Sequence, residues 1–241
     1  MRVSPTCSRC ALHTTRIQVV QPELPTTMKV VFLGRDPGSV EDEKGSPFHP
    51  AAPAGALLRR LIQEVGIPIS WCGFDNVVRC HTPKNRGPNA TEARACSVWT
   101  KVHWRDYPQL VVTLGRESYT ALVAGGSGYK PTKLDLGEIH GKPQEFADRT
   151  VIPMYHPSAG LRNGTSRRLL VADLRGLASI LGVVPEEPKY VRRWSTPVVV
   201  SNNTVSLDFE TTMQGVPVGV GVAWVEDGHV YGVYGEPHKV L

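Results

Sequence analysis

The chain has 241 residues, 41% of them hydrophobic, which is enough for one ordinary domain and part of a second. Its net charge of +5 is compatible with a polyanionic partner but does not require one. No apolar run approaches the roughly 20 residues that span a bilayer, and the N-terminus lacks an apolar signal core. We therefore expect a cytoplasmic protein that is neither secreted nor bound to a membrane.

Four of the five cysteines are candidates for one metal or cluster site, and the fifth is not. Cys7 and Cys10 form a Cys-x-x-Cys pair in an irregular N-terminal arm, and Cys80 and Cys96 follow far along the chain. In a reducing compartment this spacing indicates a metal or cluster site rather than disulfides. An iron–sulfur cluster, a zinc ion and four separate core cysteines all remain open. Cys72 lies in a predicted strand and is expected to be a buried apolar residue.

A glycine- and proline-rich turn follows the first predicted strand, residues 28–33. It reads Gly-Arg-Asp-Pro-Gly-Ser-Val-Glu-Asp over residues 34–42. Such a turn places backbone N–H groups and carboxylates at the carboxyl edge of a sheet, where open α/β sheets bind ligands. We expect the rest of the site to assemble around it.

Strands and helices then alternate along the chain. Leucines and isoleucines at helical spacing predict a helix over residues 57–65, and apolar periodicity predicts further helices over 91–107 and from about 166 to 181. Apolar runs predict strands at 72–78, 110–114 and 150–154, and residues 125–148 are expected to be a long mobile loop. Fourfold alternation predicts a three-layer α/β/α sandwich with a central four-stranded parallel sheet.

The composition changes near the end of the chain. Residues 183–197 are rich in proline and charge and are expected to be a linker. Residues 198–234 are rich in valine and glycine, with a hairpin signal at Glu226-Asp227-Gly228, which predicts a β-meander. The predicted organisation is thus a first domain over 1–182, a linker, and the incomplete start of another domain over 198–241.

Three stretches and the cysteines together resemble family 4 uracil-DNA glycosylases over about residues 4–182. The first is Gly-x-x-Pro-Gly-x-x-Glu-Asp-x-x-Gly-x-Pro-Phe at 34–48. The second is Asn-Val-Val-Arg-Cys at 76–80, followed by Pro-x-Asn-Arg-x-Pro at 83–88. The third is His-Pro-Ser-Ala-Gly-Leu-Arg at 156–162.

The resemblance implies a monomeric enzyme that hydrolyses uracil from single- or double-stranded DNA in a bacterial, archaeal or phage-infected cell. It implies that Cys7, Cys10, Cys80 and Cys96 hold a structural [4Fe–4S] cluster. In the implied uracil pocket, Gly34 and Gly38 belong to the floor, Phe48 stacks on the base, and Asn76 reads its edge. An amide offers an acceptor and donors that match the N3–H and O4 of uracil, whereas cytosine presents the opposite pattern.

The third motif supplies the expected contacts to the leaving base and to the DNA. His156 is expected to stabilise negative charge on the departing uracil. Leu161 is expected to wedge into the space left by the flipped base, and Arg162 to bind phosphate, with Pro157 and Ser158 beside them.

The catalytic carboxylate is the main departure from the family pattern. The family has a glutamate directly after the first glycine, where this chain has Arg35. Asp36 follows, in an Asp-Pro turn similar to that of the family 1 enzymes, so we expect Asp36 to position the attacking water, with Glu41 in reserve. The alternative is a module that binds uracil-DNA but has lost hydrolysis.

A last motif, Val-Ser-Leu-Asp-Phe-Glu-Thr-Thr at 205–212, resembles the first motif of the DEDD 3′–5′ exonuclease domains attached to family A DNA polymerases. Asp208 and Glu210 at i and i+2 on one strand could ligate a divalent metal if the RNase H-like domain were complete. The resemblance implies a fused or associated DNA polymerase, and an alternative in which the first domain only targets such a partner.

Overall fold

The computed structural model describes residues 3–123, 135–183, 191–192, 205–211, 217–226 and 229–235. The chain divides into two compact units, Met1–Pro185 and Glu186–Leu241, each of which is described by itself. No helix in these ranges is both long and apolar enough to cross a membrane.

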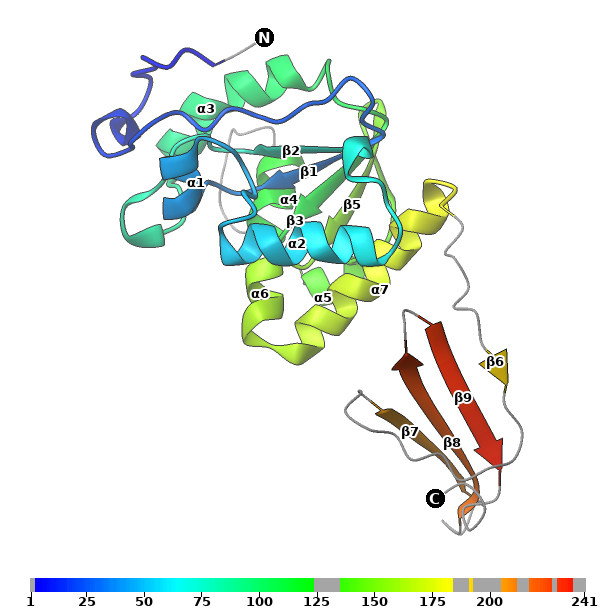
Figure 1. The fold of residues 1–241 in the computed structure, drawn as a ribbon. Helices are drawn as coiled ribbons and strands as arrows, with labels where there is room; N and C mark the ends of the chain where they lie inside the picture. The colour runs from blue at the N-terminus through cyan, green and yellow to red at the C-terminus, as the bar shows by residue number, and fades with distance from the viewer. Residues whose placement is uncertain are drawn as a thin grey trace. The chain divides into compact units, whose positions relative to one another are not determined.

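The first unit is built on a five-stranded mixed sheet (Figure 1). Its strand order is β2-β1-β3-β5-β4, and β2, β1, β3 and β5 pair in parallel. Most residues of these four strands are buried, apart from the partly exposed first residues of β3 and β5, as expected for a sheet covered on both faces. The strands are β1 (Val30–Gly34), β2 (Cys72–Asn76), β3 (Leu110–Leu114), β4 (Gln144–Phe146) and β5 (Arg149–Met154).

Two hydrophobic clusters flank this sheet, because successive strand residues point to opposite faces. Val30 and Phe32 pack with α2 and α7, whereas Val31 and Leu33 pack with the N-terminal arm, α3 and α4. Figure 1 shows α6 below α2, and α7 running past both of them on the right. The helices are α1 (Ser39–Lys44), α2 (Pro53–Glu64), α3 (Ala90–His103), α4 (Arg116–Val123), α5 (Leu136–Ile139), α6 (Pro157–Arg162) and α7 (Gly164–Ile180).

Two expectations about this unit were wrong. The sheet has five strands rather than four, and the described part of the expected loop at 125–148 contains α5 and β4. Asp135 caps α5 by accepting from the N–H of Gly137 at 2.8 Å, and β4 pairs antiparallel with β5. The ring of Phe146 packs edge-on against Trp104 with centroids 5.9 Å apart. The rest of that loop lies outside the described residues.

The end of the first unit also differs from the expectation of one helix from about residue 166. Pro157 begins a separate short helix, α6, and Asn163 ends it. Asn163 also caps α7, because its side chain accepts from the N–H of Thr165 at 2.8 Å. This break leaves His156 at the start of α6, directly after β5.

The second unit contains strands β6 (Val191–Arg192), β7 (Val205–Thr211), β8 (Pro217–Glu226) and β9 (His229–Gly235). β7, β8 and β9 form an antiparallel meander, and β6 pairs parallel to β9. β6 falls within the expected linker at 183–197, whose other residues beyond 183 lie outside the described part. Asp208 and Glu210 lie in β7, where their backbones pair with Gly221 and Gly219.

Candidate uracil-recognition cleft

The loops that leave the carboxyl ends of β1, β2, β3 and β5 enclose one cleft of about 670 Å³. The chain runs from β1 outward to β2 and then returns to β3 on the other side of β1, so the cleft lies where the strand order reverses. The predicted residues that line it are Asp36, Gly38, Glu41, Phe48, Asn76, His156, Ser158 and Arg162.

Phe48 has an unusual backbone, with φ = 47° in the left-handed region. Its N–H donates to Oε1 of Glu41, and its carbonyl accepts from Nε of Arg59 at 2.8 Å. Gly55 at the start of α2 approaches so closely that a Cβ there would lie 2.4 Å from the carbonyl carbon of Phe48. The loop is thus fixed on both sides of Phe48, as expected for a strained residue at a functional site.

Glu41 shapes the turn through both of its carboxylate oxygens. Oε2 accepts from the N–H of Gly38 at 2.6 Å, while Oε1 accepts from Phe48. Burial raises the pKa of Glu41, and the two backbone donors oppose that shift. Both carboxylate oxygens of Glu41 therefore bind the backbone of the loop that joins β1 to α2.

Asp36 is almost as buried, with a side chain that is 4% exposed. Oδ1 accepts from Nε of Arg35, and Oδ2 accepts from Oγ1 of Thr82 at 2.8 Å. Burial raises the pKa of Asp36, and the charge and hydrogen bond of Arg35 act in the opposite direction. The carboxylate is thus oriented by two donors at the edge of the cleft.

Asn76 ends β2 beside the glycine that ends β1. A Cβ at Gly34 would lie 2.3 Å from Oδ1 of Asn76 and 2.6 Å from Cζ of Phe48. Gly34 does not line the cleft itself, but its missing side chain lets these two groups approach. Asn76 is 3% exposed, and within the described part of the chain its Nδ2 has no hydrogen-bond partner. A buried amide donor that lines a cleft is a site for a ligand acceptor.

His156 caps α6, and this contact determines its tautomer. The backbone N–H of Ser158 donates to Nδ1 of His156 at 3.1 Å, so Nδ1 is the acceptor. Burial, with the charges of Arg35 and Arg162, lowers the pKa of His156 to about 4. The neutral ring therefore carries its proton on Nε2. Its centroid lies 6.0 Å from that of Phe48.

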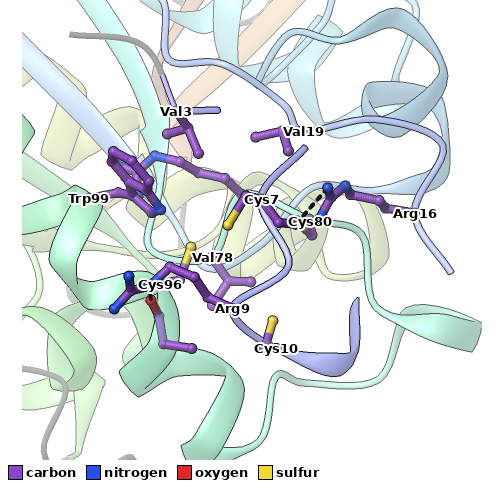
Figure 2. A pocket seen from close by; sticks show the side chains of 12 residues that line it. Val3, Cys7, Arg9, Cys10, Arg16, Val19, Val78, Cys80, Cys96 and Trp99 are labelled. Atoms are coloured by element: carbon purple, nitrogen blue, oxygen red, sulfur yellow. Dashed lines mark hydrogen bonds between the residues drawn. The ribbon is translucent and has the colours of Figure 1, made fainter. Parts of the chain in front are cut away.

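Cys7, Cys10, Cys80 and Cys96 line a second, small cavity between the N-terminal arm, the loop after β2 and α3 (Figure 2). Arg16 donates to Sγ of Cys80 at 3.4 Å and to the carbonyl of Cys7 at 2.8 Å, which ties the arm to this loop. Burial raises the pKa of the Cys80 thiol to about 11. Four thiols around one cavity are a suitable donor set for a cluster with four thiolate ligands.

In the described ranges no three or more His, Cys, Asp or Glu side chains are grouped as the ligands of a metal ion. The fifth cysteine, Cys72, is 2% exposed and packs in the core.

The remaining predicted residues lie outside the cleft lining. Pro157 is buried in the first turn of α6, and Leu161 is 51% exposed on that helix. Asp208 and Glu210 belong to the second unit. The motifs did not single out Arg59 or Thr82, because their roles depend on tertiary contacts with Phe48 and Asp36.

Comparison with known proteins gives one consistent result. The family model described as the uracil DNA glycosylase superfamily matches residues 21–175. A type-4 uracil-DNA glycosylase of Thermotoga maritima is 33% identical over 179 residues, covering 73% of this chain and 89% of that protein. A protein of the same name from Saccharolobus solfataricus is 32% identical over 188 residues, covering 74% and 83%.

Proposed function

The chain belongs to the uracil DNA glycosylase superfamily, and from this premise we propose how its cleft removes uracil from DNA. It is a uracil-DNA glycosylase, a hydrolase that cleaves the N-glycosidic bond of deoxyuridine. The observation that carries the proposal is the buried amide of Asn76. Its Nδ2 lacks a hydrogen-bond partner in the described residues, and Asn76 lines the same cleft as Phe48 and His156.

We assign base recognition to Asn76 and Phe48. The flipped base enters the cleft and stacks on the ring of Phe48. Nδ2 of Asn76 donates to O4 of uracil, and Oδ1 accepts from N3–H. Cytosine would present a donor to Nδ2 and an acceptor to Oδ1, so it would leave buried groups unpaired and be rejected.

Asp36 and His156 then act on opposite sides of the bond that breaks. Asp36 accepts a proton from a water whose oxygen bonds to C1′ of the deoxyribose. The bond from C1′ to N1 breaks, and its electron pair leaves with uracil. Nε2–H of His156 donates to O2, where the negative charge of the leaving base collects. The uracil anion takes up a proton at N1, and Asp36 loses the proton that it accepted, so the products are free uracil and an abasic site.

The geometry supports Asp36 over Glu41 as the carboxylate that positions water. Both oxygens of Glu41 accept from backbone N–H groups that hold the loop. Asp36 instead accepts from two side chains, those of Arg35 and Thr82, and from no backbone N–H group among the described contacts. We therefore assign Glu41 the role of shaping the pocket.

DNA contacts are assigned to α6. Arg162 lines the cleft and is suited to a phosphate next to the flipped nucleotide, and Ser158 lies beside it. The exposed Leu161 is suited to fill the space that the base leaves in a duplex, with Pro157 fixing the first turn of the helix. The proposed substrate is thus uracil-containing DNA, single- or double-stranded.

We also propose that Cys7, Cys10, Cys80 and Cys96 hold a [4Fe–4S] cluster. When bound, the cluster would supply a covalent tie between the N-terminal arm, the loop after β2 and α3. What supports this assignment is that all four cysteines line one shared cavity.

We propose separately that β7 carries an acidic motif of the kind found in 3′–5′ exonuclease domains. What supports it is the position of Asp208 and Glu210 two residues apart in β7, the first strand of an antiparallel meander. A divalent metal there would require the acidic residues of a complete domain.

Uracil release from an oligonucleotide with a single uracil tests the catalytic assignment. Wild type should release uracil, and Asp36→Asn should lose about 10²–10⁴-fold in turnover while still binding the oligonucleotide. Glu41→Gln is the control, because it should affect binding more than turnover. The contact of Arg35 with Asp36 favours a second candidate, a uracil-DNA-binding module in which Arg35 occupies the carboxylate. Binding without release by wild type would establish that candidate instead.

A further inference from the structure

A buried ion pair lies directly behind the residue that reads the base. The side chains of Asp75 and Arg79 are each 1% exposed, and Nη2 of Arg79 lies 2.6 Å from Oδ2 of Asp75. The hydroxyl of Tyr107 donates to the same oxygen at 2.6 Å. His103 lies 2.9 Å from the same guanidinium nitrogen, while the buried Nε of Arg79 has no hydrogen-bond partner among the described residues.

Such a pair is weak evidence for stability. Removing two charges from water is expensive, and well-packed apolar residues of similar volume often serve a core equally well. None of the catalytic steps assigned above uses either residue. We therefore looked for a neighbouring group that the ion pair holds in place.

The second carboxylate oxygen of Asp75 contacts the backbone of the next residue, Asn76. Oδ1 of Asp75 accepts from the backbone N–H of Asn76 at 2.7 Å. Asp75 thus holds the peptide from which the recognition amide extends, and Arg79 with Tyr107 holds Asp75 from behind. Asn76 is the last residue of β2 and pairs with Gly34 of β1, so the sheet and the carboxylate of Asp75 together hold its backbone.

The far end of this connection reaches the cysteine cavity. Arg79 lines that cavity directly before Cys80, and its backbone carbonyl accepts from the N–H of Val20 in the N-terminal arm at 2.9 Å. Arg79 thus contacts both the element that carries the cysteines and the carboxylate behind Asn76.

We propose that Asp75 is a positioning residue that orients Asn76 for uracil, with Arg79 anchoring it to the wall of the cysteine cavity. The proposal rests on the function assigned above, in which Asn76 reads the base. It predicts that a change at Asp75 weakens affinity for uracil itself, because the Asn76 amide would no longer be held in one orientation.

Free uracil is the probe, used as a competitive inhibitor of release from the single-uracil oligonucleotide by the cluster-loaded enzyme. Asp75→Ala should raise the inhibition constant of uracil and the KM about tenfold or more, with a smaller change in kcat. Tyr107→Phe is the matched control, because it weakens the same buried network at Oδ2 but leaves the contact of Oδ1 with Asn76. Its inhibition constant should stay within about twofold of wild type.

Thermal melting should be measured for each variant, and assays run well below the lowest midpoint. If Asp75→Ala does not fold, the isosteric Asp75→Asn is used. Its amide has a single acceptor oxygen, which cannot serve both the N–H of Asn76 and the donors of Arg79 and Tyr107. Equal inhibition constants for the Asp75 variant and Tyr107→Phe would overturn the proposal. Asn76→Ala separates the two levels of inference: if it leaves uracil affinity unchanged, the assigned role of Asn76 fails as well.

Discussion

Gly34 and Asn76 end neighbouring strands with almost no space between them. A Cβ at Gly34 would lie 2.3 Å from Oδ1 of Asn76, closer than real Cβ atoms approach such an atom. The conflict cannot be relieved on the other side, where Cζ of Phe48 would lie 2.6 Å away. The two groups assigned to the uracil edge and the uracil ring therefore meet over a position where any side chain would displace at least one of them.

A single methyl group at this position should accordingly impair catalysis. We expect Gly34→Ala to displace Asn76 or Phe48 by about 1 Å and to reduce uracil release about 100-fold. Gly38→Ala in the same turn is the control, since a Cβ there would lie 3.7 Å from Oε2 of Glu41, an ordinary contact. Single-turnover rates measure the difference, and equal rates for the two variants would show that the site tolerates the displacement.

Much of the site could be predicted from sequence motifs, because several of its residues lie at the carboxyl ends of strands. Asn76 and His156 each follow a buried run, and parallel strands bring their carboxyl ends to one edge. The strand β4 was missed because three residues with two polar side chains give no apolar period. Arg59 and the pair of Asp75 with Arg79 were missed for another reason. Their partners are set by the folded backbone, and local sequence carries no signal for them.

The acid limb of the pH–rate profile should respond to Arg35. Hydrolysis needs ionised Asp36, so the rate falls as the pH falls through the pKa of Asp36. Burial raises that pKa, while the guanidinium of Arg35 lowers it. Arg35→Gln removes the opposing effect, so the acid limb should move to higher pH.

The matched control for this profile is Arg162→Gln. Arg162 lowers the pKa of His156, whereas the largest influences on Asp36 are burial, Arg35, Thr82 and His81. Its acid limb should coincide with that of wild type. We would measure kcat/KM against pH for the three proteins. A limb that moves with Arg162→Gln as well as with Arg35→Gln would assign the titration to His156 instead, because both arginines lower the pKa of His156.

The cysteine cavity makes a compositional prediction. Anaerobically purified protein should contain about four iron atoms per chain and absorb visible light as ferredoxin-like clusters do. Cys10→Ser should lose most of the iron, because it removes one of the four ligands, whereas Cys72→Ser should retain it. Metal and sulfide analysis checks both variants. Stoichiometric zinc in a colourless protein would contradict the cluster.

Arg59 and Arg60 are adjacent on α2 but have different environments. Arg59 donates to the carbonyl of Phe48, pairs with Glu23 at 2.7 Å and lies 4.2 Å from the centroid of Phe74. Arg60 is 55% exposed and pairs only with Glu64 at 3.4 Å among the contacts described. The first residue holds the strained Phe48 loop, and the second belongs to the solvent face of the helix.

Arg59→Leu should therefore lower the free energy of unfolding by about 1–3 kcal/mol and raise KM for the oligonucleotide, because the Phe48 loop loses its donor. Arg60→Leu should change stability by less than about 1 kcal/mol and leave KM unchanged. Denaturant unfolding and steady-state kinetics measure both effects. A normal KM for Arg59→Leu despite reduced stability would show that Glu41 and the approach of Gly55 suffice to hold Phe48 against the base.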